Sequence, residues 1–185
     1  WSKLRPHAKR ISVFCYPGAP LRKWIENLSS LNEDVDVLLT HGHAEQLNLY
    51  GQQALQLPSN LQLLSIPFVS QDEYDWVLSQ CDFNIVRGED SFVRAQLAGK
   101  PFIWHIYPQE DRAHEVKLAA FLDLYLEEAN QELRLAIIAA MTWAMPTEWF
   151  GLLDQWSAYA KAWRSLLLQK QGDGGLAARL LRFTS

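Results

Sequence analysis

Short apolar runs alternate along the chain, up to Ile106, with longer segments whose apolar positions recur at helical spacing. The apolar runs predict strands over Ile11–Tyr16, Val35–Thr40, Leu61–Phe68, Phe83–Val86 and Phe102–Ile106. The intervening segments predict helices over Leu21–Leu31, Ala44–Leu55, Asp72–Gln80 and Ser91–Ala98. Alternating strands and helices form right-handed βαβ units, and such units build a parallel sheet. The pattern therefore predicts an α/β fold with a Rossmann-like parallel sheet.

Beyond Asp111 the pattern is helical throughout. It predicts helices over His114–Glu127, Gln131–Ala144 and Asp154–Lys170, with a break at Gly174–Gly175. This part holds four tryptophans, which are Trp143, Trp149, Trp156 and Trp163. Their large apolar surfaces predict that they pack the helices together, and contact with another domain is the alternative. We expect a Rossmann-like domain over residues 1–128 and a C-terminal helical extension over residues 129–185.

The composition is that of a globular domain with a substantial core. Of the 185 residues, 49% are hydrophobic and 21% are charged. The formal net charge of -4, without a basic stripe, argues against nucleic acid as a partner. No apolar run reaches transmembrane length, so no contact with a membrane is expected.

The two cysteines do not form a disulfide framework. Cys15 and Cys81 each lie within or beside a predicted buried strand, where a free thiol packs as a small apolar group. A reducing compartment suits such cysteines, and a cytoplasmic location is therefore expected.

Polar and aromatic residues follow each predicted strand. Ligands of parallel α/β sheets bind beyond the carboxyl ends of the strands, so these residues are site candidates. They are Tyr16–Gly18, Thr40–His43, Phe68–Gln71, Arg87–Ser91 and Tyr107–Asp111.

The segment after the fourth strand predicts a phosphate cradle. Gly88 permits a backbone turn that other residues resist, and a helix opening at Ser91 would point free N–H groups outward. The N–H groups of Asp90 and Ser91, with the Ser91 hydroxyl, would bind phosphate oxygens, and Arg87 adds a positive charge. The alternative is that Asp90 or Ser91 only caps the helix.

Two carboxylates lie beside this cradle. Glu89 and Asp90 would repel a phosphate, so their side chains should point away from it, towards sugar hydroxyls or a cationic group. One alternative is that both are solvated turn residues. Another is a glycosidase that pairs Glu89 with Glu110 across the scissile bond, which depends on the distance between the two carboxylates.

The other strand ends offer complementary groups for a nucleotide sugar. Tyr107 can donate to a phosphate oxygen, while Gln109 and Asp111 can bind sugar hydroxyls. Trp104 and His105 are expected to alternate into the core.

A nucleobase needs an aromatic face and an amide-like edge. Gln71 offers both donor and acceptor, Tyr74 can stack on the base, and Phe68 and Tyr16 can approach it. Ser70 is expected to cap the helix that carries Gln71 and Tyr74. The alternative for these aromatic residues is packing in the core.

His41 and His43 form a weak metal signal, because no third ligand lies nearby in the sequence. We expect a turn there, with His43 near a helix start or lining the cleft, and no metal site.

The segment RGEDSFVRAQLAGKPFIWHIYPQED (Arg87–Asp111), with His114 and KLAAFL (Lys117–Leu122), closely resembles the EarP family of protein-arginine rhamnosyltransferases. The resemblance extends with lower density through FCYPGAPL (Phe14–Leu21) and SIPFVSQDEYDWVL (Ser65–Leu78) to the end. It covers nearly the whole chain, but only about half of such an enzyme.

The resemblance implies the C-terminal, donor-binding domain of a GT-B glycosyltransferase. The donor would be dTDP-β-L-rhamnose, the acceptor an arginine of elongation factor P, and the transfer an inversion without a metal cofactor. Glu89 would be the catalytic position, and Arg87, Gly88, Asp90, Ser91 and Tyr107 would contact the donor diphosphate. A carboxylate there would hold the acceptor guanidinium, which is always protonated in water.

The family's N-terminal half, with its aspartate base and most acceptor contacts, would be the chain's partner domain. This chain alone is therefore expected to bind nucleotide sugar weakly and to transfer nothing. Two other functions stay open: a GT-B glycosyltransferase with a different donor or acceptor, and a non-catalytic module that binds protein through its helical part.

Overall fold

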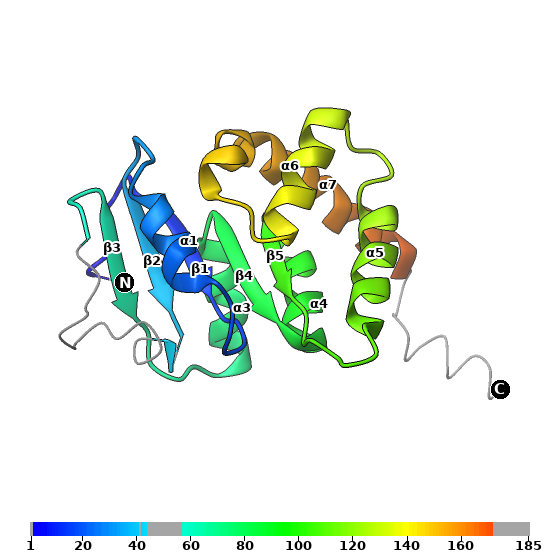
Figure 1. Ribbon diagram of the computed structural model, residues 1–185, viewed down its shortest axis with the longest axis horizontal. Coiled ribbons are helices and arrows are strands. Elements are labelled where there is room, and N and C mark those ends of the chain that lie inside the picture. Colours follow the sequence, from blue (N-terminus) through cyan, green and yellow to red (C-terminus); the bar gives the residue numbers. More distant parts are fainter. Residues whose placement is uncertain (1, 41, 44–56, 172–185) are drawn as a thin grey trace.

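A computed structural model describes residues 2–40, 42–43 and 57–171. Within them, five parallel strands form one sheet in the order β3-β2-β1-β4-β5 (Figure 1). The strands are β1 (Lys9–Val13), β2 (Val35–Leu39), β3 (Leu61–Ser65), β4 (Phe83–Arg87) and β5 (Phe102–His105). The predicted α/β class and all five predicted strands are confirmed. The predicted helix Ala44–Leu55 and the break at Gly174–Gly175 lie outside the described residues.

Four of the strands end before the predicted boundary, where their hydrogen bonds to neighbouring strands stop. β3 ends at Ser65 rather than Phe68, since Pro67 has no N–H group to continue the ladder. β1 ends at Val13 rather than Tyr16, and the N–H group of Phe14 makes the last bond to a neighbouring strand, to Ile85. The residues beyond these ends are therefore free to form loops.

Helices cover both faces of the sheet, and the alternation of β4 shows which helix lies where. Phe83 points to one face, where it stacks on Trp24 of α1 (Leu21–Leu28) at 6.4 Å between ring centroids. The next residue, Asn84, points to the other face and donates to the carbonyl of Leu78 in α3 (Gln71–Gln80). Helix α4 (Gly88–Ala98) lies beside α3 on that face.

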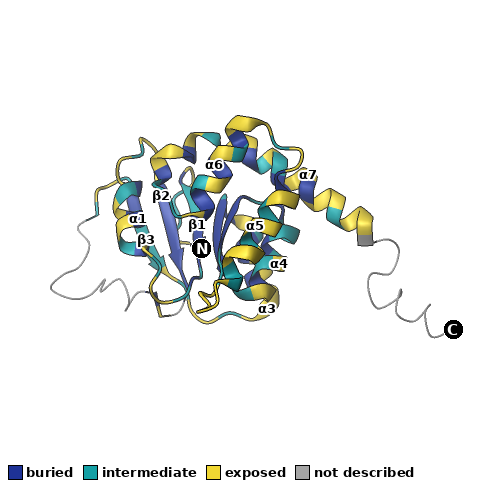
Figure 2. Cartoon of the chain, turned by 45° about the vertical axis from the view of Figure 1, so that its right-hand side comes forward, coloured by how far each residue is buried: buried dark blue, intermediate teal, exposed yellow. Residues whose placement is uncertain are grey.

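The C-terminal helices pack on the sheet and on α4. They are α5 (Ala113–Tyr125), α6 (Gln131–Met141), the 3-10 turns η1 (Pro146–Glu148) and η2 (Phe150–Leu152), and α7 (Leu153–Gln171). Trp149 and Trp156 are fully buried, and Trp149 stacks on Phe83 at 4.6 Å. Trp163 donates to Gln96 of α4 at 3.0 Å. The prediction that these tryptophans pack the helices is confirmed, and Figure 2 shows the buried sheet beneath exposed outer helix faces.

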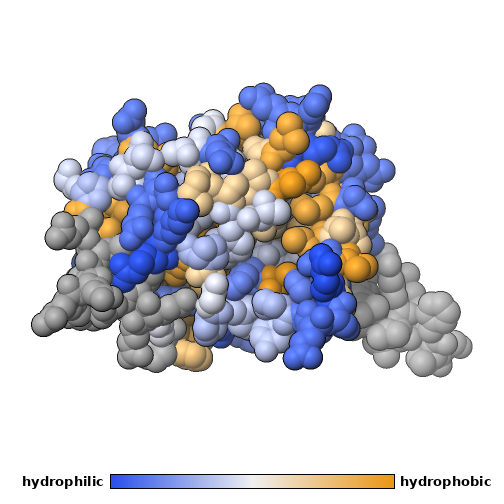
Figure 3. All heavy atoms as spheres, in the orientation of Figure 1, coloured by the Kyte–Doolittle hydropathy of each residue, from blue (hydrophilic) through white to orange (hydrophobic). Residues whose placement is uncertain are grey.

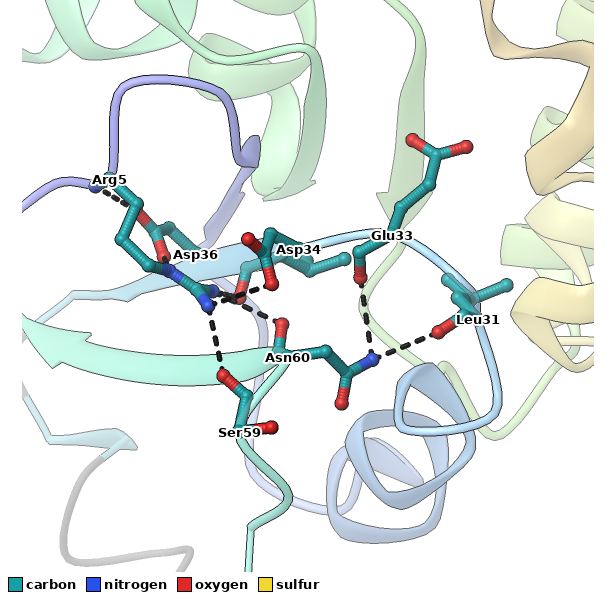
Figure 4. Close-up of polar contacts among 8 residues, drawn as sticks. Arg5, Leu31, Glu33, Asp34, Asp36, Ser59 and Asn60 are labelled. Atoms are coloured by element: carbon teal, nitrogen blue, oxygen red, sulfur yellow. Dashed lines mark hydrogen bonds and ion pairs between the residues drawn. The ribbon is translucent and has the colours of Figure 1, made fainter.

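An arginine clamp fixes the N-terminal segment to the amino ends of β2 and β3 (Figure 4). The Arg5 Nε donates to Asp36 Oδ1 at 2.7 Å, and the Asp36 side chain is fully buried. The same guanidinium donates to the carbonyls of Val35, Ser59 and Asn60 at 2.8, 3.1 and 3.1 Å. A buried carboxylate is thereby paired and hydrogen-bonded, as its desolvation requires.

The surface is unevenly polar. Figure 3 shows apolar side chains gathered over the helical part, where Leu124 of α5 and Leu135 of α6 are more than half exposed. Across residues 2–40, 42–43 and 57–171, no helix has the combination of length and hydropathy that spanning a bilayer demands. Cys15 and Cys81 are both free and buried, as the sequence predicts.

Candidate functional site

The candidate site lies where β1 and β4 meet at their carboxyl ends. The chain leaves β1 towards β2 on one side and leaves β4 towards β5 on the other, so the connections diverge between these two strands. Such a switch point opens a crevice in doubly wound sheets, and ligands bind there. Tyr16 follows β1 and Arg87 ends β4, so both predicted site residues lie at the switch point.

Helix α4 begins at Gly88, three residues earlier than predicted. Gly88 has a φ of 63°, in the left-handed region, and so reverses the chain directly from strand into helix. A helix that starts there leaves the N–H groups of Gly88, Glu89 and Asp90 without an intrahelical acceptor. Of the two predicted donors, Asp90 keeps a free N–H group, whereas Ser91 is a buried residue of the first turn, where helix geometry pairs its N–H with the Arg87 carbonyl.

No side chain caps this helix. Arg87 occupies the N-cap position in extended conformation without a side-chain hydrogen bond to the free amides. The alternative that Asp90 or Ser91 only caps the helix is therefore wrong. The amides at the positive end of the helix dipole stay available for an anion.

One strand residue and one loop residue lie against the turn. The Trp104 Nε1 donates to the Gly88 carbonyl at 2.9 Å, while the Trp104 ring stacks on Phe92. A Cβ added to Gly88 would lie 3.3 Å from the Tyr16 hydroxyl. Trp104 is buried as predicted, but its indole N–H bonds within the site, a role the sequence did not reveal.

Arg87 is half-buried, and aromatic rings hold its guanidinium. The guanidinium carbon lies 4.1 Å from the Phe14 ring centroid and 5.0 Å from that of Tyr16. Its Nη1 also donates to the Cys15 carbonyl at 3.4 Å. Stacking orients the planar cation while leaving most of its five donors unused, which suits recognition of phosphate oxygens.

The acidic side chains beside these amides point towards cationic side chains of the same chain. Asp90 pairs with Arg94 one turn further along α4, at 2.8 Å. Glu89 is mostly exposed, and its Oε1 lies 4.0 Å from the Lys117 Nζ of α5. The prediction that both carboxylates face a cationic group agrees with these contacts, although both cations belong to the chain itself.

The loop after β5 lies beside the loop that follows β1. Tyr107 is exposed, and its ring packs edge-on against Tyr16 at 5.2 Å. Gln109 and Asp111 are exposed too, and both help to start α5. The Gln109 N–H donates to His114 Nδ1 at 3.0 Å, and Asp111 accepts from the Ala113 N–H at 3.1 Å.

Of the residues predicted to bind the nucleobase, the structure leaves some exposed and buries one. Phe68 is 89% exposed and Gln71 is exposed at the start of α3, so both are available to a ligand. Ser70 caps α3 through a capping box with Glu73, as predicted. Tyr74, by contrast, is buried, because its ring packs edge-on against Phe14 at 5.8 Å. The expectation that Tyr74 stacks on the base is corrected: its face is covered.

Two histidines contact the backbone of the β1–α1 loop. His43 Nε2 accepts the N–H of Cys15 at 3.1 Å, and His105 Nδ1 accepts that of Tyr16 at 3.0 Å. The expected turn with His43 near a helix start is confirmed, and the alternative that His43 lines the cleft is wrong because the residue is buried. His105 was expected in the core, but it is half-buried and bonds to the loop. In the described part of the chain, no group of three or more His, Cys, Asp or Glu residues could hold a metal. His41 lies outside it.

Known proteins resemble the chain in sequence and in structure. It is 37% identical to a protein-arginine rhamnosyltransferase of Pseudomonas putida over 171 residues, 88% of this chain and 45% of the relative. It is 36% identical to that of Pseudomonas aeruginosa over 192 residues, 94% of this chain and 49% of the relative. The chain thus spans about half the length of these relatives.

A solved structure reported as the "Structural basis for EarP-mediated arginine glycosylation of translation elongation factor EF-P" superposes with a TM-score of 0.79 at 31% identity, covering 98% of this chain and 61% of that one. The spinosyn forosaminyltransferase SpnP matches with a TM-score of 0.54 at 14% identity, covering 99% of this chain and 45% of SpnP, which shows a shared fold only. The family model of the elongation factor P (EF-P) rhamnosyltransferase EarP matches residues 1–185. The chain therefore belongs to the EarP family of protein-arginine rhamnosyltransferases.

Proposed function

We propose that this chain is the donor-binding domain of a protein-arginine rhamnosyltransferase. It would bind dTDP-β-L-rhamnose at the switch point, and the transfer would go to an arginine of elongation factor P. The observation that carries the proposal is the Gly88 turn, where the first amides of α4 have no side-chain cap and the preceding residue, Arg87, has its guanidinium stacked on aromatic rings. Membership of the EarP family supports the choice of sugar and acceptor.

The two phosphates of the donor would be bound by the amides of Gly88, Glu89 and Asp90 and by Arg87. These groups stabilise the negative charge that grows on the diphosphate as it leaves. The Tyr107 hydroxyl, exposed across from Tyr16, would donate to a further phosphate oxygen. The proposed reaction therefore needs no metal ion, since the chain supplies the positive charge.

The nucleobase would lie towards the carboxyl end of β3. Phe68 offers an exposed ring for stacking, and Gln71 offers an amide that can pair with a thymine edge. Gln109 and Asp111, exposed after β5, would meet the sugar hydroxyls.

Glu89 would hold the acceptor guanidinium. In a single inverting displacement, a guanidinium nitrogen forms a bond to the anomeric carbon while the bond from that carbon to the diphosphate breaks, and dTDP leaves. The nitrogen loses a proton to a base, which by family resemblance is an aspartate of the N-terminal half. The acceptor would displace Lys117, whose ion pair with Glu89 is long and exposed.

The first test is calorimetric titration of the chain with dTDP-rhamnose, dTDP-glucose and UDP-glucose. We expect weak binding with preference for dTDP-rhamnose, lost in Arg87→Ala and kept in the control Arg22→Ala on α1. Preference for UDP-glucose would instead indicate another glycosyltransferase. Absence of any nucleotide binding would support a protein-binding module.

The second test concerns transfer. The chain alone, mixed with folded elongation factor P and dTDP-rhamnose, should leave the mass of the acceptor unchanged, because one wall of the acceptor site is supplied by the N-terminal half. A mass increase of one deoxyhexose would contradict this. In a full-length enzyme that contains this chain, Glu89→Gln should keep donor affinity and lower the transfer rate by at least roughly 100-fold.

The two buried thiols fit a cytoplasmic enzyme, where glutathione keeps cysteines reduced.

A further inference from the structure

The N–H groups just beyond β1 bond to histidine rings instead of to a strand. The Phe14 N–H makes the last bond to a neighbouring strand. The next two amides, of Cys15 and Tyr16, donate to His43 Nε2 and His105 Nδ1 at 3.1 and 3.0 Å. Imidazole therefore replaces the backbone carbonyl as the acceptor at the point where the chain turns into the candidate site.

This arrangement fixes the protonation state of His105. A backbone N–H can only donate, so the ring nitrogen that faces it must carry a lone pair. His105 is consequently neutral in this structure, with its proton on Nε2. A proton on Nδ1 would turn the acceptor into a donor and remove the bond to Tyr16.

The surroundings of His105 favour this neutral form. Its half-buried ring packs edge-on against Tyr16 at 5.7 Å and against Trp143, after α6, at 5.3 Å. Arg87 of β4 and His43 from the end of β2 are the ionisable groups that act on its charge. Burial, then Arg87, then His43 lower the pKa of His105 below its ordinary value.

The bond to Tyr16 fixes one wall of the candidate site. The Tyr16 ring lies 5.0 Å from the Arg87 guanidinium and 5.2 Å from Tyr107. Its hydroxyl approaches the position of a Cβ on Gly88 to 3.3 Å. Moving the Tyr16 backbone would therefore disturb the Arg87 guanidinium, the Gly88 turn and the Tyr107 ring together.

We propose that His105 is a positioning residue of the donor site, which in its neutral form holds Tyr16 against Arg87 and Gly88 and on protonation releases it. The proposal rests on the proposed function, because the ligand whose affinity it controls is the nucleotide sugar. His105 itself would not touch the reacting atoms. Donor binding would weaken as the pH falls through the titration of His105.

A simple electrostatic view predicts the opposite pH dependence. Protonation of His105 adds a positive charge near Arg87, and a further cation would attract a diphosphate. The structure favours weakening, because a proton on Nδ1 would occupy the lone pair that accepts the Tyr16 N–H. The direction of the pH dependence therefore separates positioning from plain charge attraction.

Nuclear magnetic resonance of the chain without ligand tests the positioning directly. At about pH 7.5, where the ordinary histidine is neutral, we expect the Nε2-protonated tautomer of His105 and slow exchange of the Tyr16 amide proton. Both signals should be lost together as the pH is lowered. An Nδ1-protonated tautomer, or a Tyr16 amide that stays protected when His105 is charged, would overturn the proposal.

Binding of dTDP-rhamnose supplies the second measurement, since its phosphates lack the second ionisation near pH 6 of a terminal phosphate. His105→Asn retains an acceptor that does not titrate, and should keep at every pH about the affinity that the wild type shows at neutral pH. His105→Phe retains a flat ring without an acceptor, and should bind roughly tenfold more weakly even at neutral pH, the effect of losing one hydrogen bond. His7→Asn, at an exposed position in the N-terminal segment, is the control and should keep the wild-type profile.

The outcomes separate the two proposals. If the wild-type chain binds no dTDP-rhamnose at any pH, the proposed function fails, and the resonance data still decide whether His105 holds Tyr16. If binding strengthens on acidification, or if His105→Asn keeps the wild-type pH dependence, the positioning role is wrong and the proposed function stands. If His105→Phe does not fold, the comparison of His105→Asn with wild type decides.

Discussion

Gly88 combines two requirements that only glycine meets. Its φ of 63° is strained for any residue with a Cβ, and a Cβ there would lie 3.3 Å from the Tyr16 hydroxyl. We expect Gly88→Ala to lower the free energy of unfolding by about 1–2 kcal/mol, the cost of left-handed backbone. It should also weaken dTDP-rhamnose binding at least roughly tenfold, because Tyr16 must shift. Urea denaturation and calorimetric titration measure the two effects.

Gly99, which ends α4, is a matched control with a φ of 66°. Gly99→Ala should cost comparable stability, since its Cβ would meet the flexible Arg164 side chain, and should leave nucleotide affinity unchanged. Equal losses of affinity in both variants would show that backbone strain alone, rather than the contact with Tyr16, controls binding.

His105 also links the stability of the fold to pH. Its pKa is lowered in the folded chain, chiefly by burial, so between that pKa and the ordinary value of 6.5 the unfolded chain binds more protons. The contribution of His105 to stability should thus be complete above about pH 6.5 and decline as the pH falls through the lowered pKa. Urea denaturation should show a smaller loss on acidification for His105→Asn than for wild type. An identical loss in both would contradict this linkage.

At this scale the sequence predicted the local turn better than the long-range contacts around it. The turn at Arg87 and Gly88 was predictable because a strand, a glycine and a helix follow one another locally. The bond from Tyr16 to His105 spans 89 positions, and the bond from Cys15 to His43 spans 28. No local periodicity encodes such pairs, because they form only when strands separated in sequence become neighbours.

The clamp at the amino ends of β2 and β3 acts at the scale of the elements. Arg5→Ala would leave the fully buried Asp36 carboxylate with only the bond from the Arg5 N–H. We expect the free energy of unfolding to fall by about 3 kcal/mol, as for a buried charge that loses its partner. Asp154→Ala removes an ion pair to Lys9 whose carboxylate is 95% exposed, and should cost less than about 1 kcal/mol. Comparable losses in both variants, measured by urea denaturation, would contradict this ranking.

Element boundaries show where side-chain preferences mislead. The sequence predicted α4 to open at Ser91, a residue type that favours the N-cap position. The helix opens at Gly88 instead, because the Gly88 backbone and the Trp104 indole complete the turn without a capping side chain. The strand cores were predictable because β2 is buried along its entire length and is apolar except for Asp36, which is paired with Arg5.

At the scale of the whole molecule, the boundary between the two predicted domains is less sharp in the structure than in the sequence pattern. The predicted division at residue 128 separates the Rossmann-like domain from the helical extension, yet Trp149 stacks on both Trp24 and Phe83 of that domain, at 6.2 and 4.6 Å. We expect Trp149→Ala to cost about 3–5 kcal/mol and both parts to unfold in one transition. Circular dichroism and tryptophan fluorescence should give coincident curves. Trp76→Ala, on an exposed part of α3, should cost at most about 1 kcal/mol. Two separate transitions would show that the helical part is an independent unit.

The amino ends and the carboxyl ends of the strands have different roles. The Arg5 clamp lies at the amino ends of the strands, and Tyr16, Arg87 and Tyr107 follow their carboxyl ends. Substitutions at the amino ends can therefore be selected for stability of the fold, while substitutions beyond the carboxyl ends would be selected for binding of a different sugar. If the chain binds the donor as proposed, variants with another donor should be sought in the loops after β3 and β5, while the amino ends of the strands stay unchanged so that the stability needed to tolerate those changes is kept.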